Sequence, residues 1–226
     1  MTSPDTVTPY AATHAEGLGD WRYLLGELVA RFDTAGPLEG AELALAIAEA
    51  GVRMHHHPEV DLRPDHLVVR TRTEAVDGLT QYDVDLARAV SDLADAAGAV
   101  PRPARVASLE LAIDTVDADV IRPFWVAVLG YEPDARGDLR DPAGQLPDLW
   151  FQKMDPPRTE RNRIHLDLTL PHDVAEQRLA AALAAGGRLV SDERAPAWWV
   201  LADADGNEIC LCTWQARSNS GEPDRV

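Results

Sequence analysis

Three adjacent histidines, His55, His56 and His57, stand immediately before Pro58 and Glu59 in this 226-residue chain. Imidazole is the side chain best suited to moving protons near neutral pH, and a proline stiffens the backbone that carries it. The segment therefore predicts general acid–base chemistry. Imidazole also binds metals, but this run has no further ligands at a recognisable metal-site spacing, so we expect no metal here.

The elements that must position these histidines form one α+β unit. The segment 38–54 is rich in alanine and leucine and predicts a helix, and the segment 66–73 predicts a strand. Thr80 followed by Asp83 predicts the N-terminus of a second helix, which continues through Leu93 with its apolar residues on one face.

The histidine segment resembles the pterin-4a-carbinolamine dehydratases over roughly residues 20–97. Members of that family have a His-His-Pro-Glu core, a strand, and a third histidine ahead of a Gly-Leu-Thr helix start. Residues 56–59 match the core without a gap, and residues 78–80 match the helix start. The third catalytic histidine of the family falls on Glu74 of this chain.

The resemblance implies a lyase that removes water from a 4a-hydroxytetrahydropterin without a metal or other cofactor. His56 and His57 would be the acid and the base, and Pro58 and Glu59 would lie in the substrate site. Glu74 would replace the missing imidazole, because a buried carboxyl group with a raised pKa can transfer protons. Alternatively, Glu74 pairs with His57 and keeps it charged. A small-molecule pocket with altered or lost chemistry also stays open.

The composition of the chain limits the classes of partner that it can bind. The net charge of −17 comes from interspersed acidic and basic residues without a basic cluster, which disfavours nucleic acid. We expect no membrane span and no secretory signal, and the two cysteines are too close in sequence to staple the fold, so a cytoplasmic location fits. Arginine predominance over lysine suggests a GC-rich bacterial genome. A small-molecule substrate is expected, and a homodimer is left open.

The second half of the chain contains an internal repeat. Residues 108–114 and 163–169 alternate in the same way, and each segment leads into a helical segment and an Asp-x-x-Gly turn. Each turn, at 141–144 and 203–206, precedes a final strand. Two tandem βαβββ modules are predicted, and over residues 106–215 the layout resembles the vicinal oxygen chelate, or glyoxalase-like, superfamily. The fold class is therefore α+β, with a tail at 1–19, a dehydratase-like domain at 20–97, a linker at 98–105, a glyoxalase-like domain at 106–215 and a tail at 216–226.

In metal-dependent members of that superfamily, the first and final strands of both modules hold one divalent ion. The resemblance places Glu110 and His165 at equivalent positions on the two first strands, and strand alternation turns both away from the leucines and isoleucines beside them. The final-strand positions fall on Cys210 and near Trp150 or Gln152, which is a poor set for a hard ion. Zinc could use glutamate, histidine and cysteine, but we expect a metal-free pocket.

We expect this pocket to bind substrate through Glu110, Trp150, Gln152, His165 and Cys210. Its walls are expected to come from aromatic side chains, unless these simply form the core: Trp150, Trp198, Trp199 and Trp214. The favoured function is a dehydratase-like lyase fused to a small-molecule-binding domain. The alternatives are a lyase, isomerase or tailoring enzyme that uses the second pocket, and a non-catalytic protein that binds or sequesters a ligand.

Overall fold

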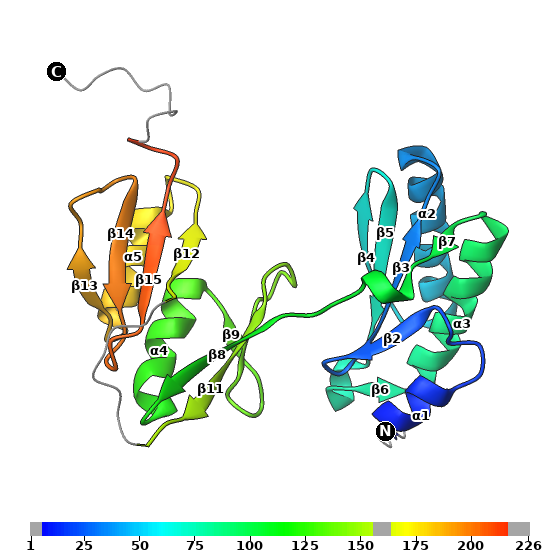
Figure 1. Cartoon of the computed structure of the whole chain (residues 1–226), viewed down its shortest axis with the longest axis horizontal. Helices are drawn as coiled ribbons and strands as arrows, with labels where there is room; N and C mark the ends of the chain where they lie inside the picture. Colours follow the sequence, from blue (N-terminus) through cyan, green and yellow to red (C-terminus); the bar gives the residue numbers. More distant parts are fainter. Residues whose placement is uncertain (1–5, 156–163, 217–226) are drawn as a thin grey trace. The chain divides into compact units, whose positions relative to one another are not determined.

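The computed structural model describes residues 6–155 and 164–216, and the chain divides into two compact units, 1–108 and 109–226 (Figure 1). Each unit contains its own helices, sheet and apolar core, which confirms the predicted α+β class. No helix within the described ranges is long and apolar enough to cross a membrane.

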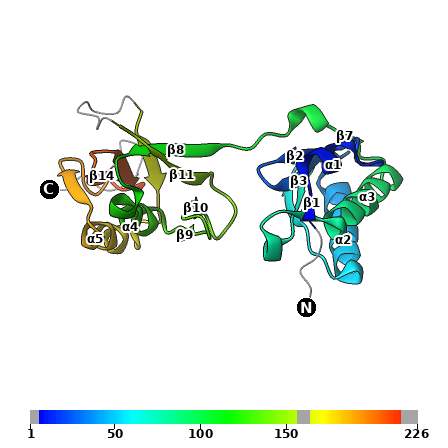
Figure 2. The ribbon, with the colours of Figure 1, turned by 90° about the horizontal axis from the view of Figure 1, so that it is seen from below.

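The N-terminal unit is an antiparallel sheet covered by two long helices. Four strands lie in the order β2-β3-β5-β4, and a short fifth strand, β7, pairs with β3. The helices α2 and α3 lie side by side on one face of this sheet (Figure 2). The elements are β2 (Trp21–Leu24), β3 (Glu27–Asp33), α2 (Pro37–Met54), β4 (Glu59–Arg63), β5 (His66–Thr71), η1 (Glu74–Val76), β6 (Leu79–Thr80), α3 (Gln81–Ala96) and β7 (Val100–Pro101).

Alternation along the strands makes this core. Leu67 and Val69 of β5 are fully buried, and Leu28 and Phe32 of β3 lie in the same cluster. Successive side chains of a strand point to opposite faces, so each central strand gives one apolar row to the helices. Removing such side chains from water contributes roughly 1.5–3 kcal/mol each. The predicted helix at 38–54 is confirmed, beginning one residue earlier.

The segment before residue 20 differs from the predicted tail. Within its described part, β1 (Thr6–Val7) pairs with β6, and α1 (Pro9–His14) is capped by the Thr8 hydroxyl. Ala12 and Leu18 are buried in the main core. Val7 and Ala15 also pack against this core, so the segment helps to hold β6 at the start of α3.

The predicted linker at 98–105 is built into the N-terminal unit. It contains β7 and the short helix η2 (Pro103–Arg105). The backbone N–H of Arg102 donates to the Arg31 carbonyl at 2.7 Å, and its guanidinium lies 2.8 Å from the Asp33 carboxylate. The first unit consequently runs through Ser108 before the chain enters the second unit.

The C-terminal unit consists of two βαβββ modules, each with a four-stranded sheet, as the repeat predicted. The sheet orders are β8-β11-β10-β9 and β12-β15-β14-β13, and the first pair in each is parallel while the others are antiparallel. The first module comprises β8 (Glu110–Thr115), α4 (Ala118–Leu129), β9 (Glu132–Pro133), β10 (Leu139–Arg140) and β11 (Asp148–Lys153). The second comprises β12 (Leu166–Thr169), α5 (Ala175–Ala184), β13 (Arg188–Ser191), β14 (Trp198–Ala202) and β15 (Glu208–Cys212).

The two modules share one core. Helices α4 and α5 pack together, and Phe124 lies close to Gly187 of the second module. The buried Trp125 indole donates to Asp203 at 2.9 Å, and the Thr115 hydroxyl donates to Asp205 at 2.5 Å. These contacts tie the helix and first strand of one module to the Asp-x-x-Gly turn of the other. Residues 217–226 of the predicted C-terminal tail lie outside the described residues.

Candidate functional site

The histidine run begins where α2 ends. His55 caps the helix in the left-handed conformation, with φ of 53°, and the next residue turns back so that the His56 backbone N–H donates to the Gly51 carbonyl at 3.0 Å. A Cβ at Gly51 would lie 2.9 Å from the Pro58 ring, so the glycine allows the close approach of the returning chain. The tight turn aims His56 toward the sheet and leaves His57 exposed.

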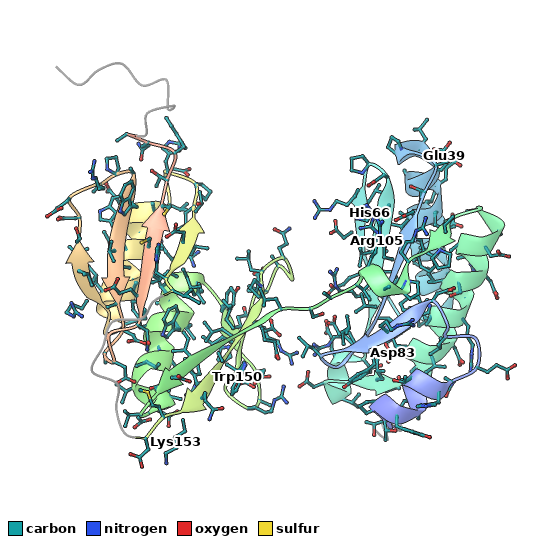
Figure 3. The ribbon with its side chains drawn as sticks, in the orientation of Figure 1. Glu39, His66, Asp83, Arg105, Trp150 and Lys153 are labelled. Atoms are coloured by element: carbon teal, nitrogen blue, oxygen red, sulfur yellow. The ribbon has the colours of Figure 1, made fainter. Side chains whose placement is uncertain are left out.

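Asp83 lies at the centre of the site (Figure 3), in the first turn of α3. Its side chain is fully buried, and it forms a capping box with Thr80. The carboxylate oxygen Oδ2 accepts from the Thr80 N–H at 2.8 Å and from the Thr73 hydroxyl at 2.7 Å. A buried carboxylate is tolerated when donors satisfy it in this way. Asp83 therefore fixes both the start of the helix and the segment after β5.

The other carboxylate oxygen holds a histidine. His56 Nε2 lies 2.7 Å from Asp83 Oδ1, and the Thr71 hydroxyl donates to the same oxygen at 2.7 Å. An ionised carboxylate can only accept, so Nε2 must carry the proton. Neutral His56 therefore presents Nδ1 as an unprotonated acceptor, and within the described part of the chain no group forms a hydrogen bond with that atom. This is the arrangement of a histidine prepared as a general base.

The charge state of Asp83 follows from its contacts. Burial alone raises the pKa of this carboxyl, but the hydrogen bonds from Thr73, the Thr80 backbone, His56 and Thr71 outweigh burial and lower its pKa below the ordinary value. Asp83 is thus ionised at neutral pH. A fixed negative charge beside Nε2 orients the imidazole and stabilises it whenever it becomes protonated.

The remaining predicted residues of this unit lie at the surface or near it. His57, Glu59 and Glu74 are exposed, Pro58 is half-buried, and Glu74 begins the short helix η1. Among the described residues, the Glu74 carboxylate makes no hydrogen bond or ion pair. The convergence of Glu74 with the two histidines therefore stays a prediction. The Tyr82 ring lies 6.1 Å from the His56 ring and forms an aromatic neighbour that the sequence did not single out.

The sequence identified Asp83 and Thr80 only as helix-capping residues and gave Thr71 and Thr73 no role at the site. The available signal was the alternation of Thr71 and Thr73, which places two hydroxyls on one side of the chain, together with an acidic residue three positions after Thr80. What it could not supply was the pairing of His56 with a residue 27 positions away. That contact depends on how α2 and α3 pack.

The C-terminal unit brings together three polar side chains in its second module. His165, Asp167 and Cys210 place one nitrogen, one oxygen and one sulfur atom within 4.8 Å of one another. Residues 165 and 167 share a face of the first strand, and Asp167 is the register partner of Cys210 on β15. Burial raises the pKa of the Cys210 thiol to about 12, and the hydrogen bond and negative charge of Asp167 contribute further. Asp167 was not among the predicted site residues.

In the first module, alternation places Glu110, Trp150 and Gln152 on the face opposite the core (Figure 3 labels Trp150). Glu110 and Gln152 are exposed, and Trp150 is half-buried. Leu111 packs on the shared core as expected, whereas Leu109 is 67% exposed, because it precedes β8 and no helix covers it. Whether Glu110 shares a pocket with the second module stays a prediction.

The expected aromatic walls divide between the core and the opposite face. Trp199 belongs to the buried core, which is the alternative that the sequence left open: alternation on β14 turns it toward the helices. Trp198 is half-buried on the other face, with the Arg194 guanidinium 5.9 Å from its ring centre. Trp214 is 48% exposed, and its indole donates to His172 at 3.2 Å.

Together the fold and the site define a two-domain α+β chain with a dehydratase-type first domain and a paired βαβββ second domain. Residues 5–93 match the family model described as pterin 4 alpha carbinolamine dehydratase, and residues 110–212 match the model described as glyoxalase-like domain. A Nocardia farcinica protein provisionally named pterin-4-alpha-carbinolamine dehydratase is 36% identical over 84 residues, which are 37% of this chain and 87% of that protein. The chain belongs to the pterin-4-alpha-carbinolamine dehydratase family through its N-terminal domain.

Other relatives match the same domains. A Natronomonas pharaonis protein with the same provisional name is 35% identical over 30% of this chain and 75% of its own length. The crystal structure of a transcriptional coactivator/pterin dehydratase from Brucella melitensis covers 40% of this chain and 99% of its own, with a TM-score of 0.38 and 19% identity. A glyoxalase/bleomycin resistance protein/dioxygenase family enzyme from Burkholderia phytofirmans covers 47% and 98%, with a TM-score of 0.40 and 17% identity.

Proposed function

We propose that this protein is a hydro-lyase that removes water from a 4a-hydroxytetrahydropterin in its N-terminal domain. The family membership supports the substrate class, and one structural observation supports the chemistry. This observation is the pairing of His56 with the buried, ionised Asp83, which leaves Nδ1 of the imidazole free to accept a proton.

The reaction needs one proton removed and one delivered. The C4a–O bond breaks as the hydroxyl leaves, a double bond forms between C4a and the ring nitrogen N5, and the N5 proton passes to a base. His56 Nδ1 is the proposed base, because its tautomer is fixed by Asp83 and Thr71. Protonation makes His56 an imidazolium, and the adjacent Asp83 charge stabilises it.

The leaving hydroxyl needs an acid. His57 follows His56 directly and is exposed, and an imidazolium side chain can donate a proton to a leaving group. Glu74, at the position of the family's third histidine, is proposed to assist by keeping His57 protonated or by donating a proton itself. An ionised carboxylate has no proton to donate, whereas an imidazolium has one, so we expect slower turnover than in a protein with histidine there.

The glyoxalase-like domain is proposed to bind a small organic molecule on the face that carries Trp150 and Gln152 in the first module. Half-buried aromatic surface beside polar groups is common in small-molecule sites. The identity of this small molecule would show whether the two domains act in one pathway. Cytoplasmic location and a bacterial source belong to the same proposal.

The experiment is a dehydratase assay on the full-length chain, with the carbinolamine generated in situ by a pterin-dependent hydroxylase. We expect measurable acceleration over the uncatalysed rate, and losses on the order of 10²–10⁴-fold in His56→Ala and His57→Ala. His55→Asn is the matched control, since this neighbour is exposed and asparagine accepts its left-handed backbone. Absence of acceleration in the wild type, or full activity in both alanine variants, would overturn the proposal.

A further inference from the structure

The second module contains a donor cluster that the proposed dehydratase reaction does not use. Histidine, aspartate and cysteine supply one nitrogen, one oxygen and one sulfur ligand, and the three atoms lie within 4.8 Å of one another. Within the described ranges, this is the one group of three or more such side chains that is close enough to share an ion. Its members are His165, Asp167 and Cys210.

Strand geometry builds the cluster. His165 and Asp167 are two residues apart, so they project from the same side of the first strand of the module. The strands β12 and β15 are parallel and hydrogen-bonded, and Asp167 lies directly opposite Cys210 in their register. Two neighbouring strands therefore present all three donors on one face. The backbone ladder fixes two of the three positions without any loop.

One of the three separations already suits a tetrahedral ion, and the other two are no longer than 4.8 Å. Zinc bonds of about 2.0–2.3 Å at tetrahedral angles put ligand atoms roughly 3.2–3.8 Å apart. His165 Nε2 and Asp167 Oδ1 are already 3.4 Å apart. We propose that His165, Asp167 and Cys210 bind one zinc ion inside the second module, with the fourth coordination position open to solvent or to a small ligand.

The composition of the set selects the ion. Mixed nitrogen, oxygen and sulfur ligands favour zinc over magnesium or calcium, which require oxygen. The half-exposed positions of His165 and Asp167, at 54% and 59%, leave an entry path from solvent, while Cys210 anchors the site from the buried side. This inference replaces the metal-free pocket expected from sequence, and the difference comes from Asp167.

The proposed site also differs from an ion shared between modules. Glu110 lies on β8 in the other sheet, and it is not a member of the cluster. The ligand set is complete with residues of β12, its preceding residue and β15. The first module is therefore not needed for zinc to bind.

Direct metal measurement tests the proposal without relying on enzyme activity. The full-length chain is stripped with chelator and titrated with zinc by calorimetry, and zinc content is measured by elemental analysis after desalting. Cobalt replaces zinc in parallel, because a cobalt–thiolate bond gives a charge-transfer absorption band that reports Cys210 directly. We expect about one zinc per chain, proton release on binding and a cobalt–thiolate band.

Variants distinguish a zinc site built by the second module alone from a zinc site shared by the two modules. His165→Gln and Asp167→Asn alter exposed side chains, so the fold should persist while zinc affinity falls by more than about 10–100-fold, the loss typical of merely supporting residues. Cys210→Ser should remove the cobalt–thiolate band. Glu110→Gln is the matched control and should bind like the wild type. No zinc retained by the wild type, unchanged binding in Asp167→Asn, or lost binding in Glu110→Gln would each overturn the proposal.

Discussion

Replacing Asp83 by asparagine tests how the N-terminal site is held. Five donor contacts converge on the Asp83 carboxylate, from His56, Thr71, Thr73, and the Thr80 backbone and hydroxyl groups. An amide keeps one acceptor oxygen and turns the other into a donor. The Thr80 N–H can only donate, so the amide oxygen must stay at the Oδ2 position. The NH₂ group then faces His56.

The magnitude follows from that geometry. The Oδ1 position loses two charge-assisted hydrogen bonds, from His56 and Thr71, each worth about 1.5–3 kcal/mol. A neutral amide–imidazole bond recovers about 1 kcal/mol. The net loss in the free energy of unfolding is therefore about 2–5 kcal/mol, which corresponds to a fall in melting temperature of at least about 8 °C for a domain of this size.

Catalysis should suffer more than folding. The amide donates to Nε2, so His56 must carry its proton on Nδ1, and the proposed base becomes a donor. A wrong tautomer of a catalytic histidine can cost on the order of 10⁴-fold in kcat, and we expect a loss between about 10²- and 10⁴-fold. KM should change little, because Asp83 is fully buried and acts through His56 as a positioning residue.

The assay combines thermal unfolding by circular dichroism with dehydratase kinetics on the full-length chain. Asp85→Asn is the control, since Asp85 is an exposed aspartate on the same helix and should change stability by less than about 1 kcal/mol. A folded Asp83→Asn variant that retains kcat within about threefold would refute the tautomer argument. An unchanged melting temperature would refute the free energy assigned to the hydrogen bonds that His56 and Thr71 make with Asp83.

Three further outcomes are expected. Glu74→His should raise kcat, since it restores an imidazole at the third position; a normally folded variant with no gain would show that this position does not limit the rate. Because the folded pKa of Asp83 lies below its unfolded value of about 3.9, its stabilisation is complete above that pH and declines as the pH falls toward the folded value. Urea unfolding between about pH 3 and pH 6 should therefore show the stability difference between wild type and Asp83→Asn shrinking below about pH 4, and a constant difference would contradict the lowered pKa. Gly187→Ala should cost about 1–3 kcal/mol in the C-terminal domain, because its Cβ would overlap the buried Phe124 ring. Gly19→Ala, whose Cβ would have no neighbour within 4 Å, should be near neutral in the same melting experiment.

Local pattern predicted much of the fold. The helix at 38–54, the strand at the start of 66–73 and the capping residues at Thr80 and Asp83 all follow from spacing within a few positions. The two βαβββ modules were predictable because the chain repeats its own alternation. In contrast, the segment 6–19 was taken for a tail, because few of its residues are apolar: Ala12 and Leu18 are buried in the core, and Val7 and Ala15 pack against it.

The site was less predictable because its contacts are not local. His56 was identified, but its partner lies on another helix, and the sequence gives no measure of how closely α2 and α3 pack. Asp167 was missed for a related reason: its significance comes from the register of β12 on β15, which places it opposite Cys210. Residue type indicated which side chains could transfer protons or bind a ligand. The packing of helices and the register of strands determined which of these side chains lie close enough to act together.

The double use of Asp83 changes how variation in related chains can be understood. The same carboxylate begins helix α3 and orients His56, so a chain that had abandoned the reaction would still need it in order to fold. An aspartate at this position in a related chain is therefore weak evidence that the chain catalyses the reaction. His57 and Glu74 have no such structural role, since both are exposed and the Glu74 side chain makes no hydrogen bond or ion pair among the described residues. Substitutions at those two positions can therefore change the chemistry without disturbing the fold around them.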